Sequence, residues 1–241
     1  MPERLHAVLY VLYLVFTEGY AATRGASLLR TDLSAEAIRL ARLVVGLVAP
    51  DRPSEVLGLL ALMLLHDARR KARLDAAGDV VVLDEQDRTL WDHAQIAEAL
   101  PLAAEAVSCA EPGPFALQAA LAAEHARATR KEDTDWKAIL RLYDRLAGDE
   151  PSPIVALNRA VAVAMVDGPA AALAIVDALA EGADLAEYHL LHAARADFAR
   201  RLGALEVAER SYERALELVG NDSERRFLER RLREVRVEKR G

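Results

Sequence analysis

The sequence has one cysteine and few aromatic residues. Cys109 has no second cysteine to pair with, so a disulfide within the chain is excluded, as expected for a protein of a reducing compartment. It lies in the alanine-rich stretch 106–110, which predicts a buried, unreactive thiol. Aromatic residues make up 5% of the chain, against 53% for apolar residues as a whole. Alanine and leucine are therefore frequent, and both are strong helix formers.

Positive charges are outnumbered by negative ones, and long apolar runs are few. The formal net charge is −7, with a sequence pI near 5.5. An acidic surface repels phosphate backbones, so we expect no direct DNA binding by this chain. The apolar run 5–16 is shorter than the roughly 20 residues that span a bilayer. We interpret it as a buried first helix, and we expect a cytoplasmic protein outside the membrane.

Motifs that carry chemistry are missing as well. The chain contains no glycine-rich phosphate loop, no G-x-S-x-G and no H-E-x-x-H. His189 and His192 are spaced like two metal ligands, but a closed zinc site needs about four, and we interpret them as packed histidines. The sequence therefore predicts a protein that is not an enzyme and that holds no cofactor or metal.

Small residues recur in the C-terminal half at an interval close to 35 residues. Ala196 and Ala208 would let two antiparallel helices touch, with Gly203 in the turn between them. Gly168 marks a second copy, with helices expected at 153–166 and 169–180. A third, degenerate copy is expected from helices 115–128 and 136–147. This pattern resembles the tetratricopeptide (TPR) repeat, whose period is roughly 34 residues.

The predicted fold is all-α: a TPR-like right-handed superhelix of stacked antiparallel helix pairs, irregular in the N-terminal half. We divide it into residues 1–110 and 111–241 of one continuous domain. The helices expected in the first part are 3–19, 33–49, 53–74 and 92–110. An interruption between 74 and 91 contains Val80–Leu83, which could pair as a short extended segment. A long loop inside a helical domain is more often functional than accidental.

Polar residues on otherwise apolar helices are the candidate site. The simpler interpretation is that these groups pair with one another and fasten loops to helices. The functional interpretation is a charged groove that grips a peptide or a partner domain. Neighbouring charged residues such as Arg73 and Arg88 belong to the same polar stretches. The candidate partner-binding residues are Glu18, Arg39, His66, Arg69, Arg70, Trp91, Asn158 and Arg159.

Several long segments resemble a known family. They are similar to the C-terminal TPR-like extension of a family of bacterial extracytoplasmic-function (ECF) RNA polymerase sigma factors, and the resemblance spans about residues 2–232. The segments that carry it are YLVFTEGY (13–20), LLALMLLHDARR (59–70), DTDW (133–136), SPIVALNRAVAVA (152–164), YHLLHAARADFARRLG (188–203) and ERRFLERRL (224–232).

The resemblance implies a regulatory role in transcription initiation through protein contacts. The implied partners are the sigma-factor domains, the RNA polymerase core, or both. Sigma domains are absent from this sequence, so we expect an excised domain or a gene product that lost them. The alternatives are a free-standing TPR-like adaptor and a small-molecule sensor near His66 and Trp91. Formation of a homodimer through the apolar first helix is a further alternative.

Overall fold

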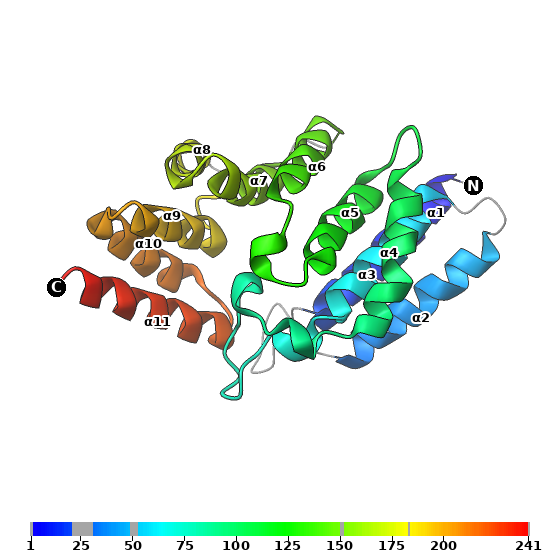
Figure 1. Ribbon diagram of the computed structural model, residues 1–241, viewed down its shortest axis with the longest axis horizontal. Helices are drawn as coiled ribbons and strands as arrows, with labels where there is room; N and C mark the ends of the chain where they lie inside the picture. Colours follow the sequence, from blue (N-terminus) through cyan, green and yellow to red (C-terminus); the bar gives the residue numbers. More distant parts are fainter. Residues whose placement is uncertain (1, 21–30, 49–52, 150–151, 183, 241) are drawn as a thin grey trace. The chain divides into compact units, whose positions relative to one another are not determined.

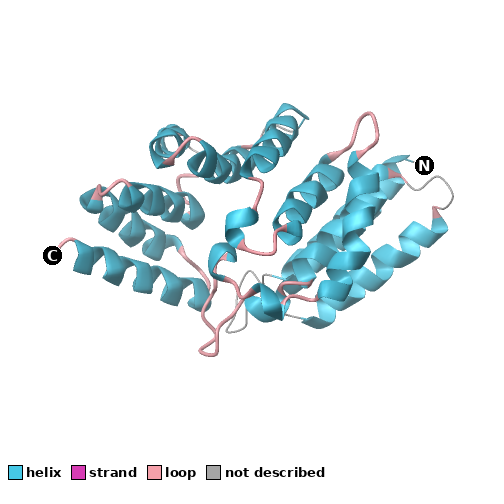
Figure 2. Ribbon diagram, viewed as in Figure 1, coloured by secondary structure: helices cyan, strands magenta, loops and turns pink. Residues whose placement is uncertain are grey.

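All regular elements that the structure describes are helices. The computed structural model describes residues 2–20, 31–48, 53–149, 152–182 and 184–240 (Figure 1). Within these ranges the only extended pairing is an isolated bridge between Leu74 and Val80, and Figure 2 shows helices and loops throughout. The all-α prediction is confirmed, and the bridge confirms the expected extended pairing at Val80.

The chain forms two compact units, Met1–Asp135 and Trp136–Gly241. The sequence analysis placed the division at residue 110 and paired helix 115–128 with helix 136–147. Helix α5 (Pro114–Arg127) instead packs on α3 (Ser54–Asp67) and α4 (His93–Val107) of the first unit. Helix α6 (Trp136–Asp149) packs on α7 (Pro153–Val166) of the second. The degenerate third repeat is therefore wrong, because its two helices belong to different units.

Helix α3 is the centre of the first unit. It contacts α1 (Pro2–Tyr20), α2 (Thr31–Leu47), α4 and α5. Every residue from Val56 to Leu65 is buried, as expected of a helix that is apolar on all sides. The first unit is thus a bundle arranged around α3, which confirms an N-terminal half that departs from simple helix pairs.

Two glycines let α5 approach α3 closely. A Cβ atom on Gly58 would lie 2.5 Å from the backbone nitrogen of Ala116, so only glycine fits there. The Glu55 carboxylate accepts the backbone N–H groups of Phe115 and Ala116 at 3.3 and 3.1 Å. A Cβ on Gly113 would collide with this carboxylate. An acidic group at a helix N-terminus satisfies free N–H groups and complements the helix dipole.

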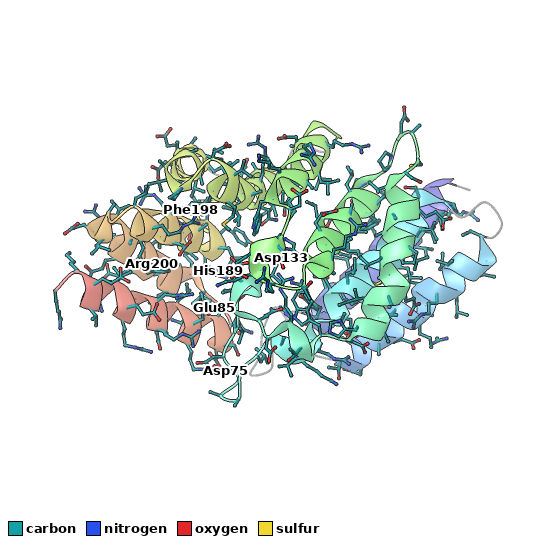
Figure 3. The ribbon with its side chains drawn as sticks, in the orientation of Figure 1. Asp75, Glu85, Asp133, His189, Phe198 and Arg200 are labelled. Carbon is teal, nitrogen blue, oxygen red and sulfur yellow. The ribbon has the colours of Figure 1, made fainter. Side chains whose placement is uncertain are left out.

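Helix α3 ends at Asp67, seven residues before the predicted end. The Ala68 carbonyl accepts the N–H of Asp92 at 2.8 Å. This carbonyl therefore does not take part in the hydrogen bonds that would continue the helix. The chain then runs through three short 3-10 turns, Arg70–Ala72, Leu83–Glu85 and Arg88–Leu90. Asp75, labelled in Figure 3, holds the tip of this segment by accepting the N–H groups of Ala77 and Asp79, both at 2.9 Å.

The second unit is a series of stacked helices. Each helix packs on the next along the chain, and α7 also contacts α9. Gly168 and Gly203 lie in the predicted turns with φ of 95° and 75°, a backbone region that favours glycine. Ala196 and Ala208 are fully buried between α9 and α10, as predicted. The stacked helix pairs are confirmed, while the right-handed sense of the superhelix stays a prediction. The remaining helices are α8 (Pro169–Glu181), α9 (His189–Arg201), α10 (Leu205–Leu218) and α11 (Asp222–Glu238).

Two surface features differ from the sequence-based expectation. Cys109 is exposed, because α4 ends at Val107 and the thiol lies in the turn beyond it. The first helix buries only one face: Phe16 lies in the core, whereas Val11 and Leu14 are exposed. Among the helices of the described ranges, none is long and apolar enough to cross a membrane.

The close approach of α3 and α5 gives a test of the fold. Gly58→Ala places a methyl group against the α5 backbone, so we expect a loss of about 1–3 kcal/mol in the free energy of unfolding. Gly46→Ala in α2 is the matched control, since a Cβ there meets nothing within 4 Å. Alanine favours helix over glycine by about 0.5–1 kcal/mol, so this variant should be as stable as the wild type or more so. Urea denaturation measures both; equal stability of the two variants would contradict the packing.

Candidate functional site

The end of α3 brings Arg69 against two aromatic groups of the first unit. Its Nη2 atom donates a hydrogen bond to the Tyr20 hydroxyl at 3.2 Å and lies 2.8 Å from Nδ1 of His66. Because a guanidinium group only donates, Nδ1 of His66 must accept and carries no proton. The rings of Tyr20 and His66 meet edge to face with centroids 5.1 Å apart. Arg69 therefore joins the ends of α1 and α3.

Trp91 lies beside the same guanidinium group and is only 4% exposed. The guanidinium carbons of Arg88 and Arg69 lie 4.7 and 6.0 Å from the centroid of its ring. Arg88 also donates through Nη1 to the carbonyls of His125 and Ala128, both at 2.6 Å, and so caps the end of α5. A cation over an indole face is favourable, more so when it is partly removed from water. We call Tyr20, His66, Arg69, Arg73, Arg88, Trp91 and His125 the arginine–aromatic cluster.

Arg73 completes the cluster on the side of α1. Its guanidinium carbon lies 3.6 Å from the centroid of the Tyr20 ring, and Nη1 donates to the Tyr20 carbonyl. Three guanidinium groups thus contact two aromatic rings, those of Tyr20 and Trp91, which are far apart in the sequence.

Both histidines of the cluster are held neutral. Burial, followed by the charges of Arg69 and Arg73 and by His125, lowers the pKa of His66 well below its ordinary value of 6.5. Burial, and then Arg69 and Arg88, lowers the pKa of His125 to about 4. Burial also lowers the pKa of Arg88. The charges that act on both imidazoles are guanidinium groups, so the cluster is an electropositive region in an acidic protein.

Asp67 and Arg70 form a separate contact next to the cluster. The Asp67 carboxylate is 5% exposed and accepts from Nε2 of Gln95 at 3.0 Å and from Nη1 of Arg70 at 3.3 Å. The hydroxyl of Ser34 lies 3.5 Å from it. This carboxylate connects α2, α3 and α4, which is the structural role that the simpler interpretation assigns to such groups.

Of the eight predicted residues, the contacts described above bring His66, Arg69 and Trp91 together. Arg39 is exposed and pairs with Glu36, one helical turn away, at 2.7 and 2.8 Å. The Arg39 guanidinium is thus paired within its own helix. Glu18 lies half-buried on α1. Arg70 binds Asp67 instead, as described above.

Asn158 and Arg159 lie in the second unit and differ from each other. Nε of Arg159 donates to Asp144 on α6 at 2.8 Å, so this arginine fastens α7 to its neighbour. Asn158 is exposed. Its spacing from Ile154, Val161 and Met165 places all four on one face of α7, and the three apolar side chains are 39–42% exposed. Asn158 thus belongs to an exposed row on α7, whereas Arg159 has a contact between helices.

Sequence reasoning missed Tyr20 and did not place His125 in the candidate site. Tyr20 ends the resembling segment 13–20, which was the only local signal for it. His125 gives no local signal, because its connection to Arg88 runs through a backbone carbonyl. In the part of the chain that the structure describes, no three histidine, cysteine, aspartate or glutamate side chains are grouped to hold a metal ion.

Comparison with known proteins gives two similarities. Residues 4–107 match the model of a family described as a family of unknown function, DUF6596. The matched region includes all of the arginine–aromatic cluster except His125. A curated relative, Uncharacterized protein R00370 of Rhizobium meliloti (strain 1021), is 46% identical over 236 residues. That alignment covers 98% of this chain and 55% of the relative, so the chain spans about half the length of the curated relative it matches.

The neutral histidines predict a pH-dependent stability. The unfolded chain protonates its imidazoles near pH 6.5, whereas folded His125 stays neutral down to about pH 4. The unfolded state therefore binds more protons between these values, and stability falls as the pH drops. For His125 alone we expect a loss of about 2 kcal/mol between pH 7 and pH 5, and His66 adds to it.

Urea denaturation at pH 7 and pH 5, in chloride medium without phosphate, measures this loss. His125→Gln should make it smaller by about 2 kcal/mol. His93→Gln, at an exposed position that begins α4, is the matched control and should keep the wild-type pH dependence. An unchanged pH dependence in His125→Gln would show that this imidazole is not held neutral.

Proposed function

We propose that this chain is a non-catalytic regulatory protein-interaction domain of an ECF sigma factor. It would act in the bacterial cytoplasm and modulate transcription initiation through contacts with the sigma domains or the RNA polymerase core. The observation that carries the interaction role is the exposed row on α7, formed by Ile154, Asn158, Val161 and Met165. Apolar side chains aligned on one helix face, with a polar amide among them, suit the binding of a protein segment.

The sequence resemblance selects the class of partner. The row on α7 begins within the segment 152–164, one of those similar to the ECF sigma-factor extension. The curated relative extends well beyond its match with this chain, since the match covers 55% of it. That additional length is sufficient for further domains in the relative, in keeping with an extension attached to sigma domains.

The alternative is a free-standing adaptor that uses the same row for an unrelated peptide. Both functions need the α7 surface, and they differ in the partner. A small-molecule sensor is a different kind of alternative and depends on the arginine–aromatic cluster instead of α7.

The test is a binding measurement with purified components. The chain is immobilised and presented with RNA polymerase core and, separately, with the sigma domains of an ECF sigma factor that carries such an extension. We expect saturable binding to at least one of them. Val161→Glu and Met165→Glu place a charge in the apolar row and should each weaken binding tenfold or more, equivalent to about 1.4 kcal/mol.

Val237→Glu on α11 is the matched control, because this valine is also exposed but lies on another helix. It should bind like the wild type, and all three variants should keep the wild-type helix content by circular dichroism. Failure to bind either partner would reject the sigma-factor role. Equal binding by the α7 variants and the wild type would reject the α7 surface.

A further inference from the structure

Two hydrogen-bond donors of the arginine–aromatic cluster are buried without an acceptor. Nε1 of Trp91 and Nη2 of Arg88 have no hydrogen-bond partner among the residues that the structure describes. Trp91 is 4% exposed, so its N–H is shielded from bulk solvent. Buried donors in folded proteins are nearly always paired, and an unpaired one calls for a specific explanation. Here both orphan donors belong to side chains that contact each other.

In the described part of the chain, the two guanidinium groups at Trp91 donate to neutral acceptors. Arg69 donates to the Tyr20 hydroxyl and His66 Nδ1, and Arg88 donates to two backbone carbonyls. The carboxylates of Asp84, Glu132 and Asp133 act on Arg88 electrostatically. The Asp133 carboxylate is hydrogen-bonded to Arg130 at 3.0 and 3.1 Å. A partly buried cation normally has an anionic partner in direct contact, and among the described residues no carboxylate is hydrogen-bonded to Arg69 or Arg88.

The geometry points to an oxyanion site at the N–H edge of Trp91, where a carboxylate or phosphate group binds the guanidinium groups of Arg69 and Arg88. Both guanidinium carbons lie within 6.0 Å of the centroid of this one ring, so a single anion at its edge is within reach of both. Guanidinium groups bind carboxylate and phosphate with two parallel hydrogen bonds. The indole N–H supplies a further donor, and an indole has no acceptor that would repel the anion.

The side chains of Arg69 and Arg88 are partly exposed, whereas the indole ring that they contact is buried. The inference is independent of the proposed sigma-factor role, because it uses the first unit and none of the α7 row. It gives the sensor alternative a defined ligand chemistry and a defined place.

The experiment uses the intact chain with Trp136→Phe, so that Trp91 is the only remaining tryptophan. Fluorescence of Trp91 and the melting temperature are followed at pH 7 during titration with sodium phosphate, sodium sulfate and sodium acetate. Sodium chloride keeps the ionic strength constant. We expect a saturable fluorescence change and a rise in melting temperature with at least one oxyanion, since a ligand that binds only the folded state stabilises it.

Three variants locate the site. Arg69→Gln should weaken the binding of that anion tenfold or more. Trp91→Phe keeps the ring and removes the N–H, and it should reduce the rise in melting temperature. Arg70→Gln is the matched control: it removes one guanidinium group from the adjacent residue, which binds Asp67. It should preserve the affinity of the wild type even if its melting temperature without anion is lower.

The anions distinguish the sources of the ligand group. Saturation by phosphate and sulfate but not by acetate assigns a phosphate-bearing ligand, and saturation by acetate alone assigns a carboxylate. The inference is overturned if none of the three anions gives a saturable response. It is also overturned if binding survives Arg69→Gln, or if Arg70→Gln weakens binding as much as Arg69→Gln does.

Discussion

The first unit depends on the burial of α3 from all sides. Ten consecutive residues of this helix, Val56–Leu65, are removed from solvent by α1, α2, α4 and α5. The arrangement requires Gly58, whose missing side chain lets the α5 backbone come into contact. Packing this dense tolerates little change in volume. It therefore fixes the position of α3 relative to the four helices around it.

The end of α3 determines which side chains of the arginine–aromatic cluster come into contact. The hydrogen bond from Asp92 to the Ala68 carbonyl stops the helix and holds the returning chain beside it. Trp91, next to Asp92 in the sequence, is thereby fixed near Arg69, and Arg88 reaches the end of α5. Burial at the edge of the core, together with the cations gathered there, lowers the pKa of His66 and of His125 and keeps both neutral. An electropositive region thus arises in a chain whose net charge is −7.

Local patterns predicted most of the helices but only part of the site. The turns at Gly168 and Gly203 and the buried Ala196–Ala208 contact follow from glycine and alanine at fixed spacing, which is local information. The end of α3 was missed because a residue 24 positions later stops the helix. Arg39 stays a predicted contact residue; its ionic partner in the structure is the near neighbour Glu36. Tyr20 and His66 are 46 residues apart, and no periodicity connects them.

The central claim is that α3 is the most protected element of the first unit, and hydrogen–deuterium exchange of the intact chain tests it most directly. Amide protons in well-packed cores exchange only through extensive unfolding, whereas those of peripheral helices open locally. The account predicts that the amides of residues 59–65 exchange more slowly than those of α2, which packs mainly on α1 and α3. Exchange of α3 as fast as that of α2 would contradict the account.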